Sequence, residues 1–156
     1  RGRDLRASGR DGGGGAAQAA VSGWGAMKRA LPDSGAWGEA VAARYLEGQG
    51  LRILGRRVRI DRRDELDVVA RDGEVLVFVE VKTRRSEAYG RPSAAVGRHK
   101  RHVLSRAAVR YLKRLKRRDI YFRFDVVEVI GEPGCEAPRV RHIENAFPLD
   151  ARYAFP

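Results

Sequence analysis

The sequence predicts one α/β domain in which a helix is followed by three strands, a second helix and two further strands. Three observations support this order. Apolar residues recur with helical spacing in two segments, at about 36–47 and 98–117. Two runs rich in β-branched residues flank an Asp72-Gly73 pair, a strong signal for a two-residue turn. Two more strand-like runs follow the second helix, and 156 residues suffice for one domain with a substantial core.

Local signals set the limits of each element. The first helix follows Ser34-Gly35 and ends at Gly48 and Gly50, because glycine favours helix C-termini. A strand is predicted at about 51–59, and the hairpin strands at 65–70 and 75–81. A polar loop at 83–97 precedes the long helix. The last two strands are predicted at about 121–130 and 139–143, on either side of a Gly/Pro loop.

Residues 1–34 differ from the rest in composition. They are rich in Gly, Ala and Arg, and four consecutive glycines at 12–15 disfavour packed structure. We therefore expect a disordered N-terminal extension, a domain at 35–150 and a tail at 151–156. Met27 is the single methionine, and one hypothesis makes it the true start of the protein. Alternatively the extension is a basic arm for nucleic acid.

The charge and the cysteine count restrict the partners and the compartment. A formal net charge of +12 favours an anionic partner, either nucleic acid or an anionic membrane surface. No apolar run reaches membrane-spanning length, and no apolar signal-peptide stretch occurs. The single cysteine, Cys135, excludes an internal disulfide framework and a cysteine-based zinc site. A cytoplasmic location is expected, because a protein with a single cysteine and no disulfides fits a reducing compartment.

Charged residues concentrate on the predicted hairpin. Pairing Arg71 with Glu74 across the turn would direct one set of side chains to the same face, namely Glu65, Asp67, Phe78, Glu80 and Lys82. Asp67 and Glu80 are then diagonal neighbours with Cα atoms about 7–8 Å apart. Two carboxylates at that spacing can bind one divalent cation such as Mg²⁺. The alternative is a structural ion pair between Lys82 and one of these acids.

The two helices each carry one charged residue on an otherwise apolar side. In the long helix Lys100 lies on the apolar stripe, and it either extends to the rim of the core or enters a polar site. In the first helix Glu39 shares a side with Leu46, and it either approaches another element or interacts only with the helix dipole.

The other side of the long helix is strongly basic, with no acid between Arg98 and Arg118. It is either a solvated face or a surface for phosphate, and its members are Arg98, Arg101, Arg106, Arg110, Lys113, Arg114, Lys116, Arg117 and Arg118. His99 and His102 are expected to be surface residues rather than metal ligands.

Several motifs in a fixed order resemble those of a known family. They are Gly38-Glu39, Glu65-Leu66-Asp67-Val68-Val69-Ala70, Val77-Phe78-Val79-Glu80-Val81-Lys82, Lys100, Arg123-Phe124-Asp125-Val126-Val127 and His142-Ile143-Glu144-Asn145-Ala146-Phe147. Over about 35–147 the chain resembles the YraN-like bacterial family. That family belongs by its motifs to the PD-(D/E)XK nuclease superfamily and is similar to archaeal Holliday-junction resolvases.

This resemblance implies a restriction-endonuclease-like fold, with a mixed β-sheet flanked by helices. It implies that Asp67 and Glu80 hold Mg²⁺ or Mn²⁺, that Lys82 is catalytic, and that Glu39 supports the metal site. One departure is Asp64, where the family usually has glycine. Asp64 is expected either to alter a bulge or to add a fourth acid near the site.

The expected function is that of a metal-dependent nuclease acting on phosphodiester bonds of DNA, with branched or single-stranded DNA as candidate substrates. Five cations are expected to hold the DNA backbone: Arg84, Arg85, Arg91, Lys100 and Arg101. One alternative is a nucleic-acid-binding protein without catalysis, and another is a protein-interaction or ribosome-associated factor. Cutting two strands would need two active sites, so a dimer is also compatible with the sequence.

Overall fold

The computed structural model describes residues 33–87, 96–117 and 119–154. Its elements are α1 (Ser34–Gly48), β1 (Arg52–Arg59), β2 (Glu65–Asp72), β3 (Val75–Arg84), α2 (Arg98–Arg114), β4 (Phe122–Ile130), β5 (Arg139–Phe147) and a short 3₁₀ helix, η1 (Ala151–Tyr153). The order of helices and strands is the predicted one, and its layout is restriction-endonuclease-like. Met27 and most of the predicted extension lie outside the described residues. The Asp33 carboxylate caps α1 by accepting a hydrogen bond from the Ala36 N–H at 2.9 Å.

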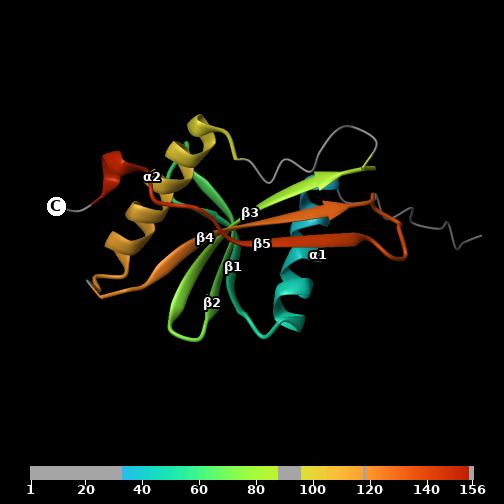
Figure 1. Ribbon diagram of the computed structural model, residues 1–156, viewed down its shortest axis with the longest axis horizontal. Helices are drawn as coiled ribbons and strands as arrows, with labels where there is room; N and C mark the ends of the chain where they lie inside the picture. Colours follow the sequence, from blue (N-terminus) through green and yellow to red (C-terminus); the bar gives the residue numbers. More distant parts are fainter. Residues whose placement is uncertain (1–32, 88–95, 118, 155–156) are drawn as a thin grey trace, which may run out of the picture. The chain divides into compact units, whose positions relative to one another are not determined.

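The five strands form one mixed sheet in the order β1-β2-β3-β4-β5. β3 and β4 are parallel, and every other neighbouring pair is antiparallel. A parallel pair needs a crossover connection, and α2 lies in the connection between these two strands. α1 and α2 lie on opposite sides of the sheet (Figure 1).

Each face of the sheet is buried under one helix. Facing α1 are side chains of β2, β3 and β4, among them Val68, Ala70, Val77, Val79, Val127 and Val129. Facing α2 is a second cluster that includes Val69, Leu76, Phe78, Leu104, Phe124 and Phe147. β3 contributes to both clusters, so it is a central strand covered on both sides, as its apolar sequence predicts.

The β2–β3 hairpin differs from the prediction in its register. Asp72 pairs with Val75, so the turn residues are Gly73 and Glu74 rather than Asp72 and Gly73. Only Gly73 has a positive φ, 55°, as in a type II′ turn, which needs glycine at its first central position alone. The pairing is therefore offset by two residues from the predicted one. An even offset keeps every side chain on its predicted face.

Two element ends also differ from the prediction. α2 ends at Arg114 instead of about 117, and Lys116 just beyond it has a φ of 52°, the left-handed conformation that terminates helices. β5 continues to Phe147 because the β4–β5 pairing contains a register shift near Asn145, whose φ is 47°. Such a bulge interrupts the alternation that marks a strand in sequence, which is why the prediction stopped short.

α1 approaches β3 closely at Gly38. A Cβ at this position would lie 1.9 Å from Thr83 Oγ1 and 3.1 Å from Thr83 Cβ. We expect Gly38→Ala to lower the free energy of unfolding by about 1–3 kcal/mol, because α1 must move away from β3. Urea denaturation measures this. Gly48→Ala is the matched control, since a Cβ there meets nothing within 4 Å. Equal stability of the two variants would contradict the close packing at Gly38.

Candidate active site

The strands β2 and β3 separate at Asp67 and Glu80, forming a fork in the sheet. Their ladder ends at the Val68–Val79 pair, after which β2 continues along β1 and β3 continues along β4. Continuing the register would place Asp67 opposite Glu80. Asp67 Oδ2 accepts a hydrogen bond from the Val81 N–H at 2.9 Å. The Asp67 carboxylate therefore accepts the hydrogen bond that a main-chain carbonyl of β2 would accept in a regular ladder. This contact occurs where β2 and β3 separate.

Glu80 is a buried carboxylate, with 8% of its surface exposed. Burial, followed by the negative charge of Asp67, raises the pKa of Glu80 to about 7, and the Lys100 ammonium opposes this rise. Lys100 Nζ lies 3.2 Å from Glu80 Oε2. Oε2 is shielded from solvent, and in the described part of the chain this ammonium is its charged partner. Two neighbouring carboxylates at a site where burial opposes their charge are candidate ligands for a cation.

Lys100 therefore enters the polar site rather than extending to the rim of the core. Lys100 is in the first turn of α2, and its side chain brings the ammonium to the Glu80 carboxylate of β3. The hairpin offset has a related effect, because continuing the observed register would place Asp67 opposite Glu80 rather than diagonal to it. The structure thus brings Asp67, Glu80 and Lys100 together.

Lys82 lies on the same face of β3 as Glu80, two residues further along. The parallel β3–β4 register places Lys82 beside Glu128. Glu128 is buried, its Oε2 lies 3.2 Å from Arg141 Nη1, and its Oε1 has no hydrogen-bond partner in the described part of the chain. Glu128 was not predicted from the sequence, although an acid within the apolar strand 122–130 was an available signal.

Glu39 does not join the two acids at the fork. Its carboxylate Oε2 accepts a hydrogen bond from Arg57 Nε at 2.6 Å, and Arg57 also lies 3.7 Å from Asp33 Oδ1. Among residues 33–87, 96–117 and 119–154, no group of three or more Asp, Glu, His or Cys side chains could hold a metal ion. The structure therefore brings together two of the three predicted metal ligands.

The residues predicted to contact the DNA backbone make different contacts within the protein. Arg91 lies outside the described residues. Arg85 Nε lies 3.6 Å from Glu132 Oε2, and the Arg84 carbonyl accepts a hydrogen bond from the Gly131 N–H at 2.8 Å. Arg101 contacts its own chain, because its Nε donates to the Val96 carbonyl at 2.6 Å and its guanidinium lies over the Phe147 ring.

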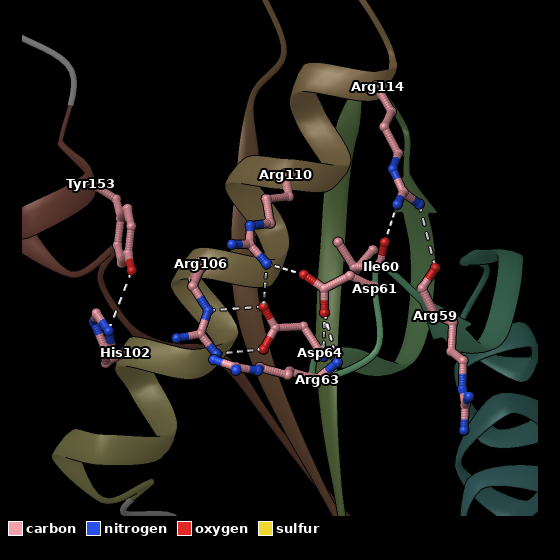
Figure 2. Close-up of polar contacts among 10 residues, drawn as sticks. All are labelled: Arg59, Ile60, Asp61, Arg63, Asp64, His102, Arg106, Arg110, Arg114 and Tyr153. Carbon is pink, nitrogen blue, oxygen red and sulfur yellow. Dashed lines mark hydrogen bonds and ion pairs between the residues drawn. The ribbon is translucent and has the colours of Figure 1, made fainter.

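The basic side of α2 is neither wholly solvated nor wholly open to phosphate. Three arginines spaced four residues apart contact the loop between β1 and β2 (Figure 2). Arg106 binds Asp64 through two hydrogen bonds of 2.8 and 2.6 Å, Arg110 binds Asp61 and Asp64, and Arg114 donates to the Ile60 carbonyl. These contacts attach α2 to the loop.

Asp64 belongs to this loop contact rather than to the fork. It is 1% exposed, and hydrogen bonds from Arg106 hold its pKa below the usual range. Asp64 therefore anchors α2 to the loop and is not a fourth acid at the fork. His102, expected on the surface, is partly buried: its ring stacks on Tyr153 and its Nδ1 lies 3.4 Å from Asp150 Oδ2.

Comparison with known proteins identifies the family. The model of the Uncharacterised protein family UPF0102 matches residues 38–129, which include Glu39, Asp67, Glu80 and Lys82. The chain belongs to the UPF0102 family. It is similar to a UPF0102 protein of Geobacter sulfurreducens, with 49% identity over 74% of this chain and 88% of the relative.

Other UPF0102 relatives give the same result. A Symbiobacterium thermophilum protein is 51% identical over 70% of this chain and 92% of its own length. A Syntrophus aciditrophicus protein is 48% identical over 74% of this chain and 89% of its own length. The predicted resemblance to the YraN-like family is thereby confirmed, because UPF0102 is that family.

In this UPF0102 chain the donor set at the fork fits a small hard cation. Mg²⁺ commonly takes one or two protein carboxylates and keeps several waters, so Asp67 and Glu80 suffice as its protein ligands. The buried Glu80 carboxylate beside Asp67 is the observation that supports this fit, because the pKa of Glu80 is raised by burial and by that second acid. Asp67 Oδ2 accepts a hydrogen bond from the Val81 N–H, and the Asp67 carboxylate also lies close enough to Glu80 to raise its pKa.

None of the helices in the described part of this UPF0102 chain is both long enough and apolar enough to cross a membrane.

Proposed function

We propose that this chain is a metal-dependent nuclease that hydrolyses phosphodiester bonds in DNA. One observation carries the proposal: the buried Glu80 carboxylate lies next to a second acid, Asp67, where two central strands diverge. Packing two acids together raises the energy of the folded protein unless a cation reduces their repulsion. Neighbouring acids that destabilise the folded protein are more typical of functional sites than of residues kept for stability.

The residues at the fork have distinct roles in this proposal. Asp67 and Glu80 would hold Mg²⁺ or Mn²⁺. When bound, such an ion activates water and offsets negative charge on the phosphate. Lys82, on the same face as Glu80, places an ammonium group where charge develops during hydrolysis, which is electrostatic stabilisation. Lys100 neutralises Glu80 from α2 and keeps its side chain directed toward the site.

The proposed substrate class follows from charge. A net charge of +12 attracts polyanions regardless of sequence, and backbone contacts of this kind position DNA without reading its bases. Branched and single-stranded DNA are the candidate forms to test first, as the superfamily resemblance implies.

A second candidate function is DNA binding without cleavage. It is favoured by Lys100, whose ammonium already offsets part of the negative charge of Glu80 in place of a metal ion. On this alternative, Asp67 and Glu80 are structural acids, and divalent cations change neither binding nor strand integrity.

Incubation of branched, flapped, single-stranded and duplex DNA and RNA with Mn²⁺ tests the proposal. We expect the wild-type protein to cut at least one of these substrates and Asp67→Asn to cut none, because the substitution removes one charged ligand. Asp119→Asn is the matched control, since Asp119 is an exposed acid between α2 and β4. Cleavage that survives in Asp67→Asn, or no cleavage of any substrate by the wild type, would contradict the proposal.

A further inference from the structure

The loop between β1 and β2 forms a small cavity with α2, separate from the fork. The cavity has a volume of about 360 Å³ and is lined by Asp61 and by four arginines: Arg62, Arg63, Arg106 and Arg110. Figure 2 shows Arg63 extending below Asp64 toward Arg106. We call the four arginines the arginine cradle. Four guanidinium groups around one cavity repel each other unless anions lie among them.

The acids of the loop neutralise only part of this charge. Asp64 and Asp61 bind Arg106 and Arg110, so four guanidinium groups face two carboxylates and a net charge of +2 remains. Arg62 and Arg63 are exposed, and within the described ranges neither guanidinium has a partner. The arginine cradle therefore makes the cavity cationic, and the guanidinium groups of Arg62 and Arg63 are available for an external anion.

The internal contacts also fix the shape of the cradle. Asp61 Oδ1 accepts hydrogen bonds from the N–H groups of Arg63 and Asp64 at 2.7 and 2.9 Å, which holds the loop in a tight turn. The buried Asp64 carboxylate holds Arg106 in one orientation. A planar guanidinium held in this way presents its remaining N–H donors to an oxyanion with little loss of conformational freedom.

We propose that the arginine cradle binds backbone phosphates of the nucleic-acid substrate at a position away from the cleaved bond, an inference that rests on the proposed function. Arginine suits phosphate because its N–H donors match two oxyanion oxygens at once. Contacts to phosphates position a nucleic acid but do not recognise its bases. The role of the arginine cradle is therefore to position the substrate, independently of its sequence.

The location of the cradle agrees with this role. α2 presents Lys100 to Glu80 and, six and ten residues further on, Arg106 and Arg110 to the loop. At the helical rise these lie about 9 and 15 Å farther along the axis. Since phosphates of one strand advance by about 3.4 Å along a duplex axis, the cradle is roughly three to four nucleotides from the fork.

Salt-dependent DNA binding without metal tests this proposal. We would measure fluorescence anisotropy of labelled single-stranded and duplex DNA of about 30 nucleotides, in EDTA and over a series of KCl concentrations. All proteins would carry Asp67→Asn, so that no cleavage occurs. In this background, Arg62→Ala with Arg63→Ala is expected to reduce the slope of log K against log [KCl] by about 1–2, because up to two phosphate contacts are lost.

Two matched variants separate the cradle from net charge alone. Arg44→Ala with Arg52→Ala removes the same charge from exposed positions on α1 and β1, and its slope is expected to stay at the parent value. Arg62→Lys with Arg63→Lys is expected to keep the slope but weaken binding, since lysine cannot form the bidentate contact. Thermal melting checks that each variant is folded, and the substituted side chains make no polar contact with the described part of the chain.

Three outcomes would overturn the inference: an unchanged slope in the Arg62/Arg63 variant, an equal loss in the Arg44/Arg52 variant, or displacement of DNA by inorganic phosphate at matched ionic strength. The last would indicate a site for free phosphate. Because binding is measured without metal, absence of cleavage by the wild type would overturn the nuclease proposal and leave this measurement intact. If the Arg62/Arg63 variant keeps the parent slope of log K against log [KCl] while the wild type cleaves DNA, the phosphate-binding role of the arginine cradle is overturned and the nuclease proposal is not.

Discussion

Glu80→Gln is expected to stabilise the protein above pH 7, by as much as about 3 kcal/mol. Burial and the neighbouring Asp67 raise the pKa of Glu80 from 4.5 to about 7, and a pKa that differs by one between folded and unfolded chains corresponds to about 1.4 kcal/mol. Below about pH 4.5 the carboxyl is protonated in both folded and unfolded chains, and Glu80 imposes no penalty. As the pH rises to about 7, the unfolded chain releases this proton more readily, so stability falls. Glutamine stays neutral throughout.

Urea denaturation of both proteins between about pH 4.5 and 8 measures this difference. The wild type is expected to lose stability relative to Glu80→Gln as the pH rises, with the gap complete above about pH 7. Lys100 loses its ion pair in the variant, but this side chain is 44% exposed, so the cost is small. Glu136→Gln, at an exposed loop position, is the control and should follow the wild type at every pH. A constant difference across the pH range would contradict the raised pKa.

The same variant is expected to lose cleavage, by about 10²-fold or more, because a neutral amide is a poor ligand for Mg²⁺ or Mn²⁺. Gain of stability with loss of activity is characteristic of a residue retained for function. A variant that is destabilised instead would show that Glu80 serves mainly as the ion-pair partner of Lys100.

Asp125→Ala is expected to lower the free energy of unfolding by about 3–5 kcal/mol, the largest stability loss among these predictions. Asp125 is fully buried on β4. Its oxygens accept hydrogen bonds from Arg123 Nε at 3.0 Å and the Asn145 N–H at 2.9 Å, and its Oδ2 lies 2.8 Å from His142 Nε2. Alanine leaves a largely buried guanidinium and the N–H of the β5 bulge without their acceptor.

Chemical denaturation near neutral pH measures this loss, and Asp72→Ala is the matched control. Asp72 binds the other side of the same arginine at 2.9 Å, but it is 45% exposed, so its loss should cost about 1 kcal/mol or less. Equal effects of the two substitutions would show that the buried network does not hold β5 to β4.

Acidification should weaken the Asp125 network. Burial acts to raise the pKa of Asp125, but hydrogen bonds from His142, Arg123 and the Asn145 N–H outweigh it and hold the pKa below its usual range. A carboxyl with a lowered pKa contributes stability above its unfolded value, and this contribution is lost as the pH falls through the folded value. Asp125→Ala should therefore show a smaller loss of stability on acidification than the wild type.

The fold could be predicted because its signals are local. Helical spacing marked α1 and α2, and β-branched runs around Gly73 marked the hairpin. The register was wrong by two residues because the sequence did not distinguish a type I′ turn from a type II′ turn. The length of β5 was underestimated because a bulge near Asn145 depends on a hydrogen bond to Asp125, twenty residues earlier.

The candidate site was predictable only in part. Asp67, Glu80 and Lys82 are charged residues in or beside apolar strands, which is visible in sequence. The contacts of Arg106 and Arg110 are not, since they join residues 42 to 49 positions apart. Both interpretations of the basic face, solvated or phosphate-binding, therefore omitted the loop that it holds. Glu39 was assigned by resemblance, and its position on Arg57 could be seen only in the structure.

Calorimetric titration of Mn²⁺ into the protein at about pH 8, above the pKa of Glu80, tests the central claim most directly. The wild type is expected to bind Mn²⁺, Asp67→Asn and Glu80→Gln to bind at least about tenfold more weakly, and Glu39→Gln to differ little from the wild type. Equal Mn²⁺ affinity in all four proteins, or no binding by the wild type, would show that the fork between β2 and β3 is not a metal site.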